Sequence, residues 1–272
     1  MDIRHPIDNR LPAMLREQPR LRGVFNGLPS PAIVEMCAYA GFDFIILDNE
    51  HGSADFETTE HMLRAARASG IVPVVRCLES DISRVLDMGA SGVQIPMVNT
   101  PEQAQALVRQ VRYPGGFGTA ASAGKSGQRG SAFSTRAAGY GAFGGAAHTL
   151  RSNDGVALIA MVETPEGAAN AGAIAAVDGV DAVFVGPNDL AHSMGFGSDW
   201  NAAPVAAAIE QALRAIAGAG KCAGIIALTV QDEDRYSQWG ARYFASVTTS
   251  IITQALHQAA GADRRAAAKI AY

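Results

Sequence analysis

A short apolar run followed by an amphipathic helix recurs along the chain, and this repeat limits the possible folds more than any other feature. We predict eight strands, because eight such runs are apolar on both faces and bounded by glycine or polar residues, as in buried parallel sheets. The predicted strands span residues 22–26, 42–47, 72–76, 92–97, 156–162, 182–185, 222–227 and 243–247.

Helical periodicity fills the intervals between these strands, and a hydroxyl residue followed by proline opens two of the helices, at Ser30-Pro31 and Thr100-Pro101. The predicted helices span residues 31–40, 56–68, 82–88, 101–111, 166–176, 204–217 and 230–239. Eight strands alternating with helices favour an α/β fold, a (β/α)8 TIM barrel. A doubly wound open sheet is the alternative, but its typical Gly-x-Gly-x-x-Gly turn does not follow the first strand.

Length and composition suit one barrel domain over residues 1–272. The chain has 272 residues, of which 48% are hydrophobic, and a typical barrel has roughly 250. Its net charge of −4 provides no electrostatic footprint for nucleic acid or an anionic membrane. The three cysteines lie in separate apolar stretches, and no apolar run approaches the roughly 20 residues of a membrane span. We therefore expect a cytoplasmic protein with free thiols.

Two segments depart from the alternation. Residues 113–153 form a long stretch rich in glycine, serine and alanine, and a connection of this length is usually functional or disordered. We interpret this stretch as a flap with a helix around residues 134–140. The alanine-rich C-terminal segment, residues 251–272, is expected to be a helix that packs on a neighbouring subunit.

Polar residues gather where four of the predicted strands end. Because the carboxyl ends of barrel strands meet at one mouth, where barrel enzymes place their active sites, we expect these residues to converge. They are Asp48-Asn49-Glu50-His51, Arg76, Glu163 and Gly186-Pro187-Asn188-Asp189.

Glu163 and Asp189 follow neighbouring strands, which lie about 4.8 Å apart in a sheet. Two carboxylates at that distance repel each other unless a cation or a proton lies between them. An all-oxygen pair suits Mg²⁺ or Mn²⁺, so we predict a metal site at Glu163 and Asp189. Capping of the following helix or turn by each carboxylate is the alternative.

The other polar residues suggest roles around such a metal. His51 is a candidate general base near neutral pH, tuned by Asp48 or Asp87. Arg76 provides a permanent positive charge for a developing enolate oxygen, although a salt bridge to Glu50 or Glu79 is the alternative. The backbone N–H groups of Asn188 and Asp189 are candidates for binding a substrate carboxylate.

At these positions the chain resembles the HpcH/HpaI family of metal-dependent pyruvate aldolases. The similarity extends in order from about residue 23 to residue 247, and the whole set is specific although no single motif is. The matching stretches are Ala40-Gly41-Phe42-Asp43, Asp48-Asn49-Glu50-His51, Val74-Val75-Arg76, Leu86-Asp87-Met88-Gly89-Ala90, Pro96-Met97-Val98, Arg112-Tyr113-Pro114, Val162-Glu163-Thr164 and Gly186-Pro187-Asn188-Asp189-Leu190.

The resemblance implies a metal-dependent aldol addition or cleavage on a barrel. A divalent metal (Mg²⁺ or Mn²⁺, with Co²⁺ as a further candidate) would be held by Glu163 and Asp189 and would bind pyruvate or a similar 2-oxo acid, with an aldehyde as second substrate. His51 would govern proton transfer, Asp87 would raise its basicity, and Arg76 would stabilise the enolate. The assembly implied is a homo-oligomer such as a hexamer with exchanged C-terminal helices.

Two differences from the family concern the substrate site. Met161 stands two residues before Glu163, where some members have glutamine, and residues 115–126 look inserted beside the mouth. The stretch between Arg76 and Asp87 is also about three residues shorter than the resemblance suggests.

Three other functions fit parts of the sequence. A Schiff-base aldolase needs an interior lysine, but the three lysines, Lys125, Lys221 and Lys269, are not on the inner face of a predicted strand. A citryl- or malyl-thioester lyase would share the barrel and the two carboxylates. A metabolite-binding barrel without catalysis is the third alternative.

Overall fold

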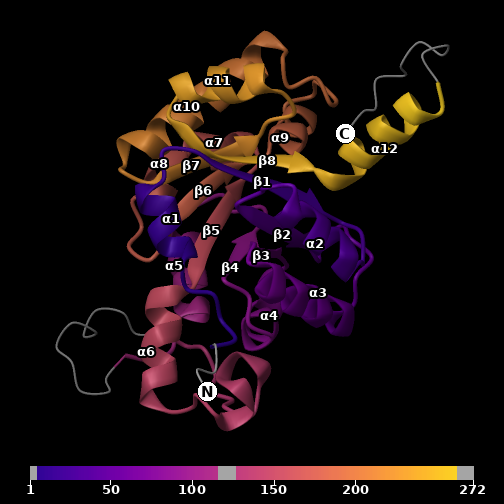
Figure 1. Ribbon diagram of the computed structural model, residues 1–272. Helices are drawn as coiled ribbons and strands as arrows, with labels where there is room; N and C mark the ends of the chain where they lie inside the picture. Colours follow the sequence, from indigo (N-terminus) through magenta and orange to yellow (C-terminus); the bar gives the residue numbers. More distant parts are fainter. Residues whose placement is uncertain (1–4, 116–126, 262–272) are drawn as a thin grey trace.

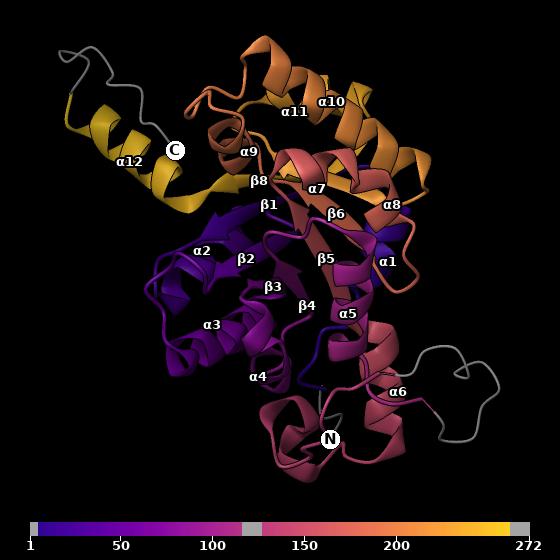
Figure 2. The same cartoon turned by 180° about the vertical axis from the view of Figure 1, so that it is seen from behind.

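Eight parallel strands close into a barrel in the order β1 to β8, with β1 paired to β8 (Figures 1 and 2). The computed structural model describes residues 5–115 and 127–261. The (β/α)8 prediction is confirmed, and each strand begins and ends within two residues of its predicted position. The strands are β1 (Leu21–Asn26), β2 (Phe44–Asp48), β3 (Val72–Arg76), β4 (Gly92–Ile95), β5 (Ala157–Val162), β6 (Ala182–Val185), β7 (Cys222–Ile226) and β8 (Ala241–Val247).

Helices follow the strands and cover the outside of the barrel. Thr100 caps α5 through a complete capping box, as predicted, whereas the predicted side-chain cap at Ser30 is not formed. The predicted helix 166–176 is divided in two at Asn170. The helices are α1 (Leu11–Glu17), α2 (Pro31–Tyr39), α3 (Phe56–Ser69), η1 (Glu79–Asp81), α4 (Ile82–Asp87), α5 (Pro101–Val111), η3 (Arg136–Gly141), α6 (Ala146–Gly155), α7 (Pro165–Ala169), α8 (Ala171–Ala175), α9 (Pro187–Ser193), α10 (Ala203–Gly218), α11 (Val230–Gln238) and α12 (Thr248–Ala259).

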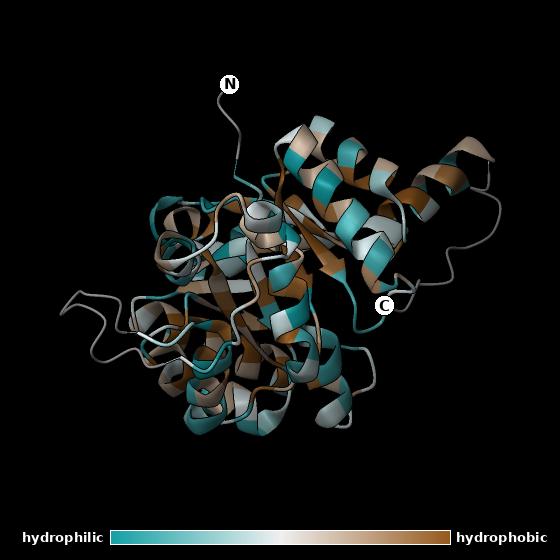
Figure 3. Cartoon of the chain, turned by 90° about the horizontal axis from the view of Figure 1, so that it is seen from below, coloured by the Kyte–Doolittle hydropathy of each residue, from teal (hydrophilic) through white to brown (hydrophobic). Residues whose placement is uncertain are grey.

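The core has two parts, one inside the barrel and one between the barrel and its helices. In Figure 3 the strands are mostly coloured hydrophobic and the outer helices mix both colours, as expected for helices with one buried face. Alternate strand residues point inward. At the mouth, parallel register places Asp48, Arg76 and Gln94 side by side on β2, β3 and β4.

Helix α1, which the sequence analysis did not predict, closes the N-terminal end of the barrel. Its Leu11 and Leu15 are fully buried and belong to the same apolar cluster as the inward-facing strand residues. Arg242, at the start of β8, donates hydrogen bonds to the carbonyl oxygens of Leu15 and Gln18. The polar residues predicted to form a site lie at the opposite, C-terminal end of the barrel.

The described part of the predicted flap is packed against the N-terminal end of the barrel. Helix α5 leads the chain from the mouth to that end, where Arg112 donates a hydrogen bond to the Val156 carbonyl just before β5. Arg136 binds the Met88 carbonyl, and His148 is 1% exposed. The predicted helix 134–140 corresponds to the short η3, while the predicted insertion at 115–126 lies almost wholly outside the described residues.

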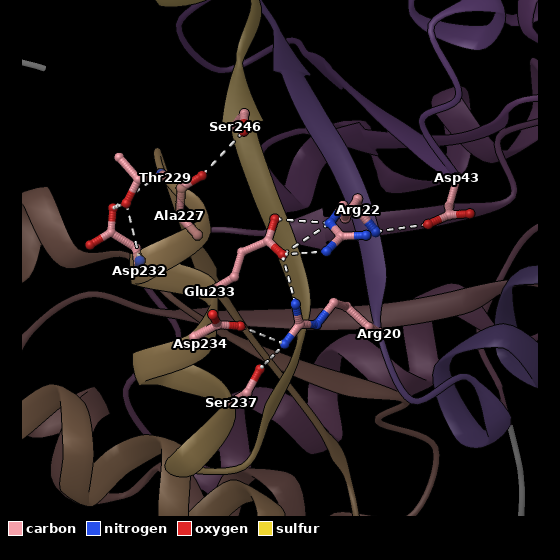
Figure 4. Close-up of polar contacts among 10 residues, drawn as sticks. All are labelled: Arg20, Arg22, Asp43, Ala227, Thr229, Asp232, Glu233, Asp234, Ser237 and Ser246. Atoms are coloured by element: carbon pink, nitrogen blue, oxygen red, sulfur yellow. Dashed lines mark hydrogen bonds and ion pairs between the residues drawn. The ribbon is translucent and has the colours of Figure 1, made fainter.

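Ion pairs tie α11 to the start of the barrel (Figure 4). Glu233 on α11 accepts hydrogen bonds from Arg22 on β1 and from the adjacent Arg20. Arg20 also donates to Asp234 and Ser237. These bonds connect the helix between β7 and β8 to the first strand on the outside of the closed barrel.

Helix α12 projects away from the barrel in both views (Figures 1 and 2). Within the described residues it packs only lightly, against β1 and β8, and Ile251 and Leu256 are 44% and 63% exposed. No helix in the described ranges is both long and apolar enough to cross a membrane. The three cysteines are buried free thiols, as predicted.

Candidate active site

The ends of β2 and β3 are joined by a buried ion pair. Arg76 binds Asp48 through two parallel hydrogen bonds, from Nε to Oδ1 at 2.9 Å and from Nη2 to Oδ2 at 2.6 Å. The same Oδ1 accepts the backbone N–H groups of Glu50 and His51. Asp48 thereby fixes both the guanidinium and the loop that presents His51.

Two further contacts hold the Arg76 guanidinium at the mouth. Its Nη1 lies 3.4 Å from Oε2 of Glu50, and its Cζ lies 4.9 Å from the centre of the Phe25 ring. Burial works against the charge of Arg76, but the hydrogen bonds and negative charge of Asp48 outweigh it and raise the pKa of Arg76. The alternative salt bridge to Glu50 is thus present, and the arginine remains a fixed cation beside the predicted metal site.

Glu163 follows β5 and is buried, with 3% of its surface exposed. Burial raises the pKa of Glu163 to about 7, and the nearby negative charges of Asp189 and Glu50 add to the increase. Its Oε1 accepts the backbone N–H of Met97 at 2.8 Å, and Met97 adopts a left-handed φ of 58°. The side chain is therefore oriented toward the mouth, and Thr164 rather than Glu163 caps the following helix.

The predicted turn after β6 is the start of helix α9. Gly186 is its N-cap and Pro187 its first residue, so Asn188 and Asp189 lie in the first turn, where backbone N–H groups have no acceptor within the helix. A Cβ at Gly186 would lie 2.6 Å from Oε2 of Glu163, so only glycine leaves this oxygen its space. The buried Oδ1 of Asn188 has no hydrogen-bond partner among the described residues.

These oxygen atoms fit a divalent cation. Glu163 has one oxygen held by a backbone N–H and the other beside Gly186, and two more carboxylates raise its pKa. A positive charge at this point would relieve that repulsion. No group of three or more His, Cys, Asp or Glu side chains in the described ranges is arranged to hold a metal. The pair Glu163 and Asp189 thus suits Mg²⁺, which keeps several positions for water and substrate oxygens.

The two remaining predicted catalytic residues are placed differently. His51 is at the mouth, with its side chain 66% exposed and its Nε2 3.9 Å from Oε1 of Glu50. Asp87 ends α4, which runs from the mouth to the N-terminal end of the barrel, and it binds Nη2 of Arg129 at 2.7 Å. Within one chain, the predicted contact between Asp87 and His51 is therefore not formed.

A pocket of about 430 Å³ opens beside these residues. Its walls come from the loops after β2, β3 and β4, and they are mainly apolar with two carboxylates. The lining residues are Glu50, Leu78, Glu79, Ser80, Ile95, Pro96, Met97, Val98, Gln103 and Leu107. A second substrate bound in this pocket would lie next to the carboxylates at the mouth, Glu50, Glu163 and Asp189.

Sequence reasoning did not assign a site role to Glu50 or Met97. The sequence offered a signal for Glu50, because it stands between Asp48 and His51, which were both predicted to lie at the mouth. The Met97 N–H contact depends on a left-handed backbone at a non-glycine residue, and the sequence contains no signal for that.

A sequence profile described as HpcH/HpaI aldolase/citrate lyase matches residues 21–252, which includes every strand of the barrel. The chain belongs to this family. The hydroxypyruvate/pyruvate aldolase of Delftia acidovorans is 36% identical over 252 residues, which cover 91% of this chain and 89% of that protein. The hydroxypyruvate/pyruvate aldolase of Deinococcus radiodurans is 39% identical over 241 residues, covering 86% and 82%.

A solved structure supports the same relationship. The crystal structure of an HpcH/HpaI aldolase/citrate lyase family protein from Burkholderia cenocepacia matches with a TM-score of 0.85 and 33% identity, over 94% of this chain and all of that one. The predicted family and enzyme class, a carbon–carbon lyase of the aldolase type, are thereby confirmed. The Schiff-base alternative gains no support, because Lys221 lies at the N-terminal end of β7 and binds the Val180 carbonyl.

Proposed function

We propose that the enzyme forms or cleaves an aldol between the enolate of a pyruvate-type 2-oxo acid and an aldehyde, with Mg²⁺ or Mn²⁺ bound at Glu163 and Asp189. The observation that supports this most is the buried Glu163 carboxylate at the barrel mouth, with Oε1 held by the Met97 N–H and Oε2 beside Gly186. The nearby negative charges of Asp189 and Glu50, which raise its pKa, agree with a cation at this point. A divalent cation bound there supplies positive charge that favours the enolate over the keto acid.

Arg76 has the geometry to stabilise the same negative charge. Asp48 holds its guanidinium through two hydrogen bonds, so the cation is oriented before the substrate arrives. The first-turn N–H groups of Asn188 and Asp189 would bind the substrate carboxylate, because groups at that position have no acceptor in the helix. The 430 Å³ pocket beside Glu50 would take the aldehyde.

His51 would move the proton. In the cleavage direction its Nε2 takes the proton from the aldol hydroxyl, the carbon–carbon bond breaks, and the electron pair of that bond becomes the enolate. The protonated His51 would then return the proton to the terminal carbon of the enolate, which gives the 2-oxo acid. Its exposed ring suits this exchange with substrate and solvent. Asp87 would assist only from another subunit, because α4 leads it away from the mouth of its own barrel.

The proposal extends to the assembly and its location. The exposed apolar residues Ile251 and Leu256 on the projecting α12 support a homo-oligomer such as a hexamer. The free, buried cysteines are consistent with the cytoplasm.

Glu163→Gln and Asp189→Asn test the metal assignment. We expect each variant to lose at least about a hundredfold in Mg²⁺- or Mn²⁺-dependent aldol cleavage, as for removal of a principal charge-stabilising group. The melting temperature of Glu163→Gln should not fall, because the neutral amide removes a carboxylate whose charge is disfavoured by burial.

Two results would decide against the assignment. Near-normal metal-dependent turnover in both variants would show that these carboxylates do not hold the metal. Turnover of an acyl-coenzyme A thioester, but not of free oxo acids, would replace the aldolase with the thioester-lyase alternative.

A further inference from the structure

The pocket beside the mouth is the space that the proposed mechanism gives to the aldehyde, and two of its lining residues also belong to the carboxylate site. Glu50 lies beside Arg76, and Met97 donates its backbone N–H to Glu163. His51, the proposed proton carrier, has its Nε2 3.9 Å from Oε1 of Glu50. An aldehyde in this pocket would therefore have its carbonyl end toward the enolate and His51, while its remaining atoms contact the pocket walls.

The charged residues of the pocket lining are both glutamates, and no lysine, arginine or histidine is among the lining residues. Glu50 has a compensating cation, because Nη1 of Arg76 lies 3.4 Å from its Oε2. Glu79 has none, since within residues 5–115 and 127–261 its carboxylate forms no ion pair and its hydrogen-bond partner is the neutral amide of Gln110. The pocket therefore carries one uncompensated negative charge, at Glu79.

Glu79 is held at the pocket wall by its place in the chain. It begins η1, in the connection between β3 and α4 that is about three residues shorter than the family resemblance suggests. This connection supplies three consecutive lining residues, Leu78, Glu79 and Ser80. Gln110 donates its Nε2–H to Oε1 of Glu79 from α5, which forms another wall of the pocket. The carboxylate is therefore an oriented feature of the pocket, although it is exposed to solvent.

The rest of the lining is mainly apolar, and this sharpens the effect of the charge. A carboxylate on the aldehyde would leave water for an apolar surface and approach a like charge, and both conditions disfavour it. An uncharged aldehyde meets neither penalty, and its hydroxyl groups would have a carboxylate oxygen to donate to. The apolar lining residues are Leu78, Ile95, Pro96, Met97, Val98 and Leu107.

We propose that this pocket prefers uncharged aldehydes to aldehydes that carry a carboxylate, and that Glu79 is the residue that determines the preference. This inference rests on the proposed function, since it concerns the second substrate at the same mouth. Glu79 is assigned neither to the metal nor to the proton, so its substitution should change which aldehyde is used rather than whether an enolate forms.

Two aldehydes of the same shape provide the test, 4-oxobutanoate and its uncharged amide, 4-oxobutanamide. Each is condensed with pyruvate in the presence of Mn²⁺, and the measured quantity is the ratio of kcat/KM for the amide to kcat/KM for the acid. We expect a ratio above one for the unmodified enzyme. Raising the ionic strength should lower this ratio, because the charge of an exposed carboxylate is screened by salt.

Glu79→Gln preserves the shape of the side chain and removes its charge. The ratio should fall about fivefold, the effect of removing one like charge a few ångströms away at an exposed site. Glu79→Lys should lower the ratio by about 25-fold in all, because an attraction replaces the repulsion. A purely structural role of Glu79 would change the rates with both aldehydes equally and would not follow the sign of the charge.

Glu57→Gln is the matched control. Glu57 is also an exposed glutamate, with 86% of its side chain accessible, but it lines a different pocket, between α3 and α4. Its substitution removes the same charge from the chain and should leave the ratio unchanged.

Binding decides the same question without turnover. Oxalate, a planar dianion, can occupy the metal in place of the enolate, so that the aldehyde binds beside it without reacting. With Mn²⁺ and oxalate, dissociation constants of the two aldehydes from saturation-transfer NMR should show the same order and the same response to Glu79→Gln and Glu79→Lys.

Two outcomes would overturn the inference. One is an unmodified enzyme that favours the acid, and the other is a ratio that both substitutions at Glu79 leave unchanged. Failure of the unmodified enzyme to turn over either aldehyde would contradict the proposed function instead, while the dissociation constants would still decide the role of Glu79.

Discussion

At the scale of single residues, the best-organised part of the site is the pair Asp48 and Arg76. Burial acts to raise the pKa of Asp48, but the hydrogen bonds and charge of Arg76 outweigh it, and the pKa lies below its ordinary value of 3.8. A carboxylate with a lowered pKa stabilises the fold above its unfolded pKa, and the contribution is lost as the pH falls through the lower, folded value. The pair should therefore be intact at neutral pH.

Asp48→Asn should destabilise the protein by about 3 kcal/mol at pH 7, because it leaves a buried guanidinium without its bidentate partner. Urea unfolding measures this difference. The deficit of the variant should shrink as the pH falls below 3.8, because Asp48 of the unfolded wild type binds a proton there before the folded protein does. The deficit should reach its minimum once the pH is below the lower, folded pKa. Glu57→Gln, at a side chain that is 86% exposed, should change stability by less than about 0.5 kcal/mol. A variant as stable as the wild type at pH 7 would contradict this account.

At the scale of elements, α12 contributes little to the core of its own barrel, because Thr248 is the one buried residue among Thr248–Ala259. Its apolar residues Ile251 and Leu256 are exposed, which is costly unless another surface covers them. In the proposed homo-oligomer, this helix is therefore the element expected to pack on a neighbouring subunit.

Ile251→Lys combined with Leu256→Lys should convert the oligomer into smaller species, because two charges would be placed in the covered face. Light scattering after size exclusion measures the mass. His257→Lys, which replaces one polar residue of the same helix by another, should keep the assembly of the wild type. A wild-type protein that is monomeric, or a double variant with unchanged mass, would exclude this role for α12.

The elements also differ in how well the sequence predicts them. Strands were predicted within two residues because each is a continuous apolar run between polar or glycine boundaries. Helix α1 was missed because it is short and depends on a tertiary contact, the insertion of Leu11 and Leu15 into the open end of the barrel. The sequence does not indicate that residues 127–155 pack at the N-terminal end of the barrel, because their place depends on where α5 ends.

At the scale of the whole molecule, barrel topology explains which part of the site the sequence predicts. Residues that end a strand or directly follow one, such as Arg76 and Glu163, reach the mouth because all eight strands point the same way. Asp87 does not follow a strand, and α4 leads it to the opposite end.

The proposed mechanism also predicts behaviour of the intact enzyme without any aldehyde. If the mouth forms an enolate, the methyl protons of pyruvate should exchange with deuterated water, since enolate formation and reprotonation need no acceptor. His51→Ala should slow this exchange more than it weakens pyruvate binding, because His51 is assigned to the proton and not to the carboxylate.

The most direct test of the central claim is therefore proton NMR of pyruvate in deuterated water, with the enzyme and Mg²⁺ or Mn²⁺, repeated with excess chelator. We expect the methyl signal to decay with the metal and to persist with the chelator. A methyl signal that persists with metal in the presence of folded enzyme, or that decays equally with the chelator, would contradict metal-dependent enolate formation at this site.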